Sequence, residues 1–151
     1  MTLTAPGSVS VKDFNDSAPR LWRATIARLR RAFPGLEYAV RWEVQGRGAV
    51  HAHAVFVIPN APVNVEQLVH ESVSAVRSRS EAEPWRKRAV RWGFFTAEEP
   101  ENLFAVSHYM NKDSTLAPIP GFRGRTFTMS RGFVGKPLDE VKKLYVSQRR
   151  N

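Results

Sequence analysis

Two apolar segments joined by a glycine-containing turn constrain the fold of this chain more than any other feature. LEYAVRWEVQ (36–45) and AVHAHAVFVI (49–58) are rich in aromatic and β-branched residues, and they flank Gly46-Arg47-Gly48. Runs of this composition around a short glycine turn are typical of a β-hairpin. The second run is apolar apart from two histidines, so it predicts a buried strand in which both imidazoles need a partner.

The remaining elements are predicted from hydrophobic periodicity and from turn residues. Helices are expected over 18–33, 64–79, 98–112 and 137–149, and further strands over 2–5, 89–96 and 125–130. Hairpins that alternate with helices indicate an α+β fold with a mainly antiparallel central sheet, in the split-βαβ arrangement of ferredoxin-like and RRM-like folds. At this length we expect one domain over 1–151, with its core over about 1–130.

The charge balance favours a polyanionic partner. The chain has 23 Lys and Arg against 14 Asp and Glu, a net charge of +9, and nucleic acid is the first candidate for such a protein. We expect a basic groove built from the arginines of 18–33, the stretch 84–88 and Arg123, Arg125 and Arg131. The candidate nucleic-acid contacts among these are Arg20, Arg23, Arg86, Lys87 and Arg88.

Composition also excludes several classes of protein. Cysteine is absent, so neither a disulfide framework nor a thiolate metal site is possible. No apolar run has the roughly 20 residues that span a bilayer, and the first residues lack the pattern of a signal peptide. We therefore expect a cytoplasmic protein without a membrane partner.

His51 and His53 form a candidate metal site with Glu43. Residues two apart in a strand face the same side of the sheet, so both imidazoles project together. Glu43 lies on the paired strand, eight positions before His51. Two histidines and a carboxylate can bind one divalent ion and leave positions for water or a phosphate oxygen. Gln45 shares the face of Glu43 and is an alternative ligand or supporting residue.

Tyr109 and Lys112 form the second candidate site. Leu103, Val106 and Met110 make the apolar stripe of the predicted helix 98–112, and Tyr109 lies on its flank, with Lys112 one turn further on. Such a pair is most often packing, but beside a metal site the phenol can be a nucleophile and the ammonium can stabilise phosphate charge. The role of His108, next to Tyr109, stays open.

Taken together, the motifs resemble those of the HUH endonuclease superfamily, and within it the single-tyrosine rolling-circle replication initiators of plasmids and phages. The matching segments, in the order of the family, are Thr2-Leu3-Thr4, Glu43-Val44-Gln45 with Arg47 to His53, and Tyr109-Met110-Asn111-Lys112. Trp92-Gly93 is similar to the segment that precedes the tyrosine helix in actinobacterial-type initiators. The resemblance covers most of residues 2–112.

The resemblance implies a function for each motif. Glu43, His51 and His53 would hold one Mg²⁺ or Mn²⁺ ion, and Tyr109 would attack single-stranded DNA at a replication origin with the help of Lys112. The products would be a 5′-phosphotyrosine and a free 3′-hydroxyl for a polymerase, with a host helicase as a further partner. Thr2, Thr4 and Arg47 would contact the DNA. Tyr38 and Tyr145 have no matching motif around them.

Two alternatives stay open at this point. A single-tyrosine transposase of the same superfamily shares the motif order, and a non-catalytic module could bind single-stranded nucleic acid through basic and aromatic residues alone. The order of histidines before tyrosine argues against a conjugative relaxase. No G-x-x-x-x-G-K-[ST] motif is present, so we expect no helicase domain.

Overall fold

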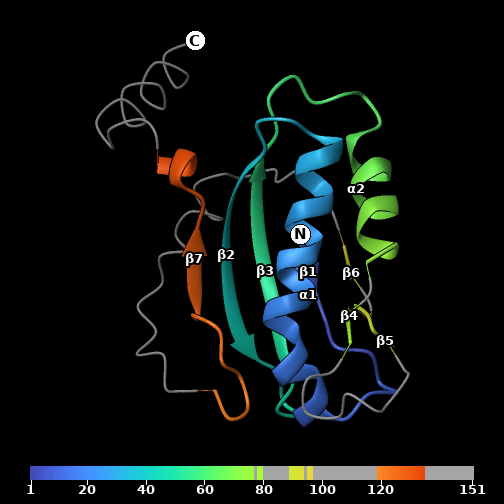
Figure 1. Cartoon of the computed structure of the whole chain (residues 1–151), viewed down its shortest axis with the longest axis vertical. Helices are drawn as coiled ribbons and strands as arrows, with labels where there is room; N and C mark the ends of the chain where they lie inside the picture. Colours follow the sequence, from blue (N-terminus) through green and yellow to red (C-terminus); the bar gives the residue numbers. More distant parts are fainter. Residues whose placement is uncertain (77, 80–88, 94, 97–118, 135–151) are drawn as a thin grey trace.

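The computed structural model describes residues 1–76, 78–79, 89–93, 95–96 and 119–134 (Figure 1). The predicted helices 98–112 and 137–149 lie outside the described residues. A five-stranded sheet has the strand order β6-β1-β3-β2-β7. Its strands are β1 (Thr2–Leu3), β2 (Glu37–Val44), β3 (Val50–Val57), β6 (Phe95–Thr96) and β7 (Phe127–Met129).

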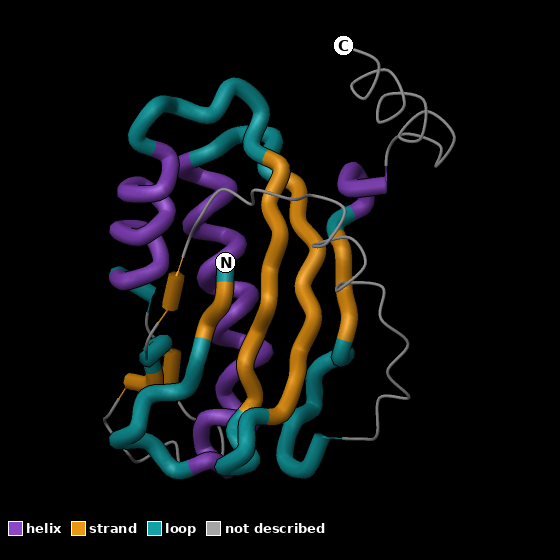
Figure 2. Tube along the Cα trace, turned by 180° about the vertical axis from the view of Figure 1, so that it is seen from behind, coloured by secondary structure: helices purple, strands orange, loops and turns teal. Residues whose placement is uncertain are grey.

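The sheet contains the split-βαβ unit that the sequence predicts. β1 and β2 both pair with β3 in antiparallel orientation, so they run in the same direction with β3 between them. The chain passes from β1 to β2 through helix α1 (Val11–Ala32), and from β3 towards β6 through helix α2 (Val65–Ser74). Both helices lie on the same side of the sheet (Figure 1; Figure 2, from behind). The α+β class is therefore confirmed.

Helix α1 begins seven residues before the predicted start at residue 18. Ser10 caps it, because the Ser10 side chain accepts a hydrogen bond from the backbone N–H of Asp13 at 3.1 Å. Pro19 lies inside the helix, where its missing N–H normally interrupts the hydrogen-bond ladder. Phe14, N-terminal to the proline, is completely buried. Tertiary packing therefore extends the helix through a residue that would otherwise limit it.

The segment predicted as one strand over 89–96 is divided between two sheets. β5 (Ala89–Val90) pairs with β4 (Ser78–Arg79), while β6 forms the edge of the main sheet beside β1. Between them, the Trp92 indole N–H donates a hydrogen bond to Thr25 Oγ1 at 2.9 Å. Gly93 passes so close to Pro6 that an added Cβ would lie 2.7 Å from the Pro6 backbone. These two contacts turn the chain out of strand geometry.

The other boundaries differ by smaller amounts. β2 and β3 are each one residue shorter at both ends than predicted, β1 is two residues long, and β7 covers 127–129 rather than 125–130. Helix α2 ends at Ser74 instead of residue 79, because residues 78–79 pair as β4 with β5. A short 3-10 helix, η1 (Arg131–Val134), follows β7.

An aromatic cluster fills the space between the sheet and α1. Trp42 of β2 lies 6.3 Å from Trp22 of α1, 6.2 Å from Trp92 and 4.9 Å from Phe122, measured between ring centroids. Tyr38, also on β2, packs edge-to-face against Trp22. Even-numbered residues of β2 therefore face the helices. By strand alternation, Arg41 and Glu43 face the opposite side of the sheet.

Candidate metal centre

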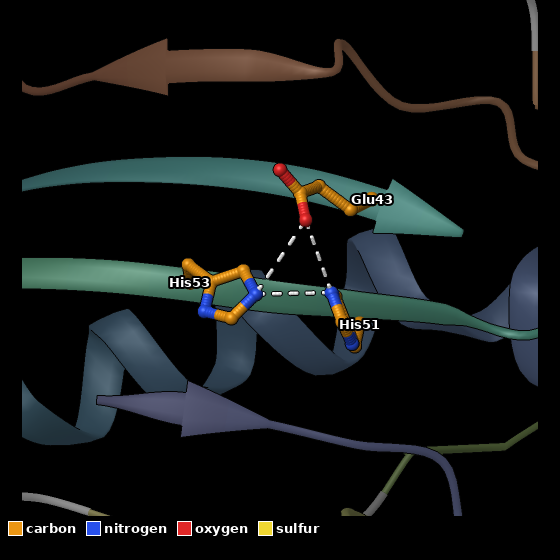
Figure 3. Close-up of side chains that lie close together, drawn as sticks. All are labelled: Glu43, His51 and His53. Carbon is orange, nitrogen blue, oxygen red and sulfur yellow. Dashed lines mark hydrogen bonds and ion pairs between the residues drawn. The ribbon is translucent and has the colours of Figure 1, made fainter. Parts of the chain in front are cut away.

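The register of the central hairpin brings the three predicted ligands together. Glu43 is directly opposite His51 across the β2–β3 ladder, and His53 follows two residues later on the same face of β3. Figure 3 shows the three side chains on the sheet surface, with α1 behind the strands. Side chains directly opposite in an antiparallel pair have Cβ atoms about 5 Å apart, so a carboxylate and an imidazole at these positions can meet.

The donor atoms have the spacing that one metal ion requires. His51 Nε2 and His53 Nε2 are 2.9 Å apart, and Glu43 Oε2 lies 3.4 Å from His51 Nε2 and 3.7 Å from His53 Nε2. Bonds of about 2.1 Å to an octahedral ion place neighbouring donors about 3.0 Å apart. Shifts of a few tenths of an ångström would thus bring all three atoms onto one ion, so the residues fit the divalent metal that the sequence predicts.

The environment of His53 favours its neutral form, which is the form that binds metal. Burial lowers the pKa of His53 below its usual value, and the neighbouring His51 lowers it further, while Glu43 acts in the opposite direction. Thr2 Oγ1 of β1 lies 3.1 Å from His53 Nδ1. With the proton on Nδ1, His53 donates to Thr2 and keeps the Nε2 lone pair towards Glu43 and His51.

A second charged residue lies against the carboxylate. Arg41 Nε is 3.1 Å from Glu43 Oε1, and the Arg41 side chain is only 5% exposed, against 31% for Glu43. The two oxygens of Glu43 therefore have different neighbours: Oε1 faces the guanidinium and Oε2 faces the two imidazoles.

Asn15 supports the hairpin from the other side of the sheet, a role that the sequence reasoning missed. The buried Asn15 side chain accepts a hydrogen bond from the Val50 N–H at 2.9 Å and donates to the carbonyls of Gly48 and Pro120, both at 3.1 Å. These bonds hold the start of β3 one residue before His51. The signal would have been an amide on the apolar stripe of α1, but the stripe was started at residue 18.

The predicted nucleic-acid contacts do not all adjoin the three-residue site. Arg20 and Arg23 lie on α1, which covers the opposite side of the sheet (Figure 1). The guanidinium of Arg47, in the hairpin loop, donates a hydrogen bond to the Ala5 carbonyl at 2.6 Å. Thr4 follows β1 and accepts a backbone hydrogen bond from Gly93. Thr2 alone among this group contacts the site, through His53.

Several predicted residues can be located only by their position in the chain. Tyr109, Lys112, Arg86, Lys87, Arg88 and His108 lie outside the described residues. Gln45 is the first residue of the hairpin loop, and its N–H donates to the Ala49 carbonyl at 2.8 Å. Tyr38 lies on the helix-covered face, against Trp22, and therefore on the other side of the sheet from Glu43.

None of the helices in the described part of the chain has the length and apolar character to cross a bilayer. Searches of curated proteins and of solved structures find no significant match to the chain. A family model described as replication-associated protein ORF2 matches residues 1–114 of the 151. This range contains Glu43, His51 and His53 as well as Tyr109 and Lys112. The chain therefore belongs to this family of replication-associated proteins, which confirms its resemblance to rolling-circle replication initiators.

Proposed function

We propose that this protein nicks and rejoins single-stranded DNA at a replication origin and thereby initiates rolling-circle replication. The observation that carries the proposal is the group of Glu43, His51 and His53 in a chain of a replication-associated family. A net charge of +9 suits a DNA partner. Replication-associated membership also favours an initiator over a transposase.

The proposed reaction is a transfer of one phosphoryl linkage. The Tyr109 hydroxyl attacks the scissile phosphorus and loses its proton to solvent, so that an O–P bond forms to the tyrosine. The bond from phosphorus to the 3′-oxygen breaks, and that oxygen takes up a proton as a free 3′-hydroxyl. A polymerase can extend this end while a host helicase opens the duplex. Attack of a 3′-hydroxyl on the phosphotyrosine reverses the sequence and joins the strand.

The residues of the chain divide the work between them. Glu43, His51 and His53 would hold the Mg²⁺ or Mn²⁺ ion, which polarises the scissile phosphate when bound. The lowered pKa of His53 keeps its imidazole neutral for this purpose. Lys112 would balance negative charge that develops as Tyr109 attacks. A separate histidine base is not required, because the ion lowers the barrier at phosphorus.

The first test combines a pool of single-stranded oligonucleotides with Mn²⁺ and sequences the cleaved ends. We expect Tyr109→Phe to abolish both the nick and the covalent adduct while the metal still binds, because only a hydroxyl is removed. Tyr38→Phe and Tyr145→Phe are the matched controls and should keep activity. Mass spectrometry of the digested adduct should find a nucleotide on a peptide that contains residue 109.

The outcomes separate the proposed enzyme from a binding module. Cleavage that persists in the presence of a chelator would contradict the metal-dependent mechanism, and an adduct formed by Tyr109→Phe would contradict the assignment of the nucleophile. Binding to single strands without any cleavage in Mn²⁺ or Mg²⁺ would favour the non-catalytic alternative.

A further inference from the structure

Arg41 is a buried cation on the same face of the sheet as the candidate metal ligands. It is 4% exposed, although a buried guanidinium loses most of its hydration and needs a compensating partner. Its Cα partners are His53 on β3 and Phe127 on β7, so strands flank it on both sides. With a 5% exposed side chain, Arg41 has little surface to offer a DNA phosphate directly.

Arg41 forms an ion pair with one particular oxygen of Glu43. Arg41 Nε lies 3.1 Å from Glu43 Oε1, and the other oxygen, Oε2, lies 3.4 Å and 3.7 Å from the imidazole nitrogens (Figure 3). The guanidinium is planar and rigid, so its positive charge occupies a fixed place beside Oε1. The ion pair therefore constrains the rotation of the carboxylate as well as its position.

We propose that Arg41 is a positioning residue that orients Glu43 towards the metal ion. This inference rests on the proposed metal site, and it assigns a role to a residue outside the three ligands. Since Oε1 is held by Arg41, Glu43 offers the ion one oxygen, and the site supplies three donors. The remaining positions of an octahedral shell stay available to water and to oxygens of the scissile phosphate.

The decisive variant is Arg41→Lys, because it keeps the positive charge and removes the planar guanidinium. Mn²⁺ titration of the full chain by calorimetry should show an affinity about 10- to 100-fold lower than that of the wild type, the usual effect of losing a residue that supports a metal ligand. Arg23→Lys, on α1 across the sheet, is the matched control and should bind Mn²⁺ as the wild type does. Circular dichroism of the metal-free proteins checks the fold.

A double-mutant cycle distinguishes positioning from a general structural effect. In a Glu43→Ala background, Arg41→Lys should change Mn²⁺ affinity by less than about twofold, because the carboxylate that Arg41 orients is gone. If Arg41→Lys lowers the affinity equally in both backgrounds, Arg41 does not act through Glu43 and the inference is overturned.

The inference and the proposed function fail in different ways. If the wild type and Glu43→Ala bind Mn²⁺ equally, the metal site itself is wrong. If the wild type binds through Glu43 but Arg41→Lys binds as tightly, only the role of Arg41 is wrong. Should Arg41→Lys not fold, Arg41→Gln replaces it. That change also removes a positive charge near the ion, so a weaker affinity supports positioning against the electrostatic trend, and an unchanged or higher affinity overturns it.

Discussion

The two faces of the central sheet are built from the same strands but have opposite chemistry. On β2, Tyr38, Val40 and Trp42 point towards the helices, and Val40 and Trp42 are buried there. The residues between them, Arg41 and Glu43, point to the other side and adjoin His51 and His53 of β3. Apolar contacts under the helices hold the strands in register, and that register brings the polar side chains together.

The comparison shows how adjacent residues can have separable effects. Trp42 and Glu43 are neighbours in the chain, yet one lies among aromatic rings and the other beside two imidazoles. A substitution on the helix-covered face should lower stability with little change in metal binding. A substitution on the other face should do the reverse. The following predictions test this separation, from the largest expected effect to the smallest.

Trp42→Ala should lower the free energy of unfolding by about 3–5 kcal/mol, because it removes a buried indole from the contacts with Trp22, Trp92 and Phe122. Urea denaturation measures the change, and Trp42→Phe should show a smaller loss. The protein that remains folded should bind Mn²⁺ with the affinity of the wild type. Loss of Mn²⁺ binding in fully folded Trp42→Phe would show that the two faces are coupled.

His51→Ala should weaken Mn²⁺ binding at least 100-fold, or about 2.7 kcal/mol, because a direct ligand is lost rather than a supporting residue. The free energy of unfolding without metal should change by less than about 1 kcal/mol, since His51 does not belong to the buried core. Calorimetric titration and urea denaturation measure the two quantities. His70→Ala, an exposed histidine on α2, is the control, and an equal loss in both variants would refute a specific site.

The smallest expected effect is a pH dependence of stability that originates on the polar face. The pKa of His53 is lower in the folded chain than its usual value of 6.5, so the unfolded chain binds more protons between these two values. Stability linked to His53 is then fully present above pH 6.5 and is lost as the pH falls through the folded pKa.

We expect His53→Gln to remove this dependence, because an amide does not titrate in that range. Urea denaturation in the presence of a chelator, repeated at several pH values, should show the wild type losing stability relative to His53→Gln as the medium is acidified. A wild type that gains relative stability on acidification would mean that His53 is charged in the folded protein.

The central hairpin and its ligands were predictable because their signals are local. Alternation along β3 places His51 and His53 on one face, and the short loop around Gly48 sets Glu43 opposite His51. The start of α1 and the break after β5 were not predictable in this way. Pro19 weakens the helix signal where Phe14 packs, and Trp92 leaves strand geometry to reach Thr25, 67 positions earlier in the chain.

The sequence by itself determined the two-sided character of the strands, the α+β class and the identity of the three candidate ligands, because a period of two residues is a property of the chain alone. Only the tertiary structure decided that Arg41 is buried against Glu43, that Thr2 reaches His53 and that Asn15 holds the hairpin. Each of these contacts depends on how the strands and α1 pack against one another. The position of the α1 arginines across the sheet from the site was likewise decided by packing, since charge in a sequence has no direction until the helix has a neighbour.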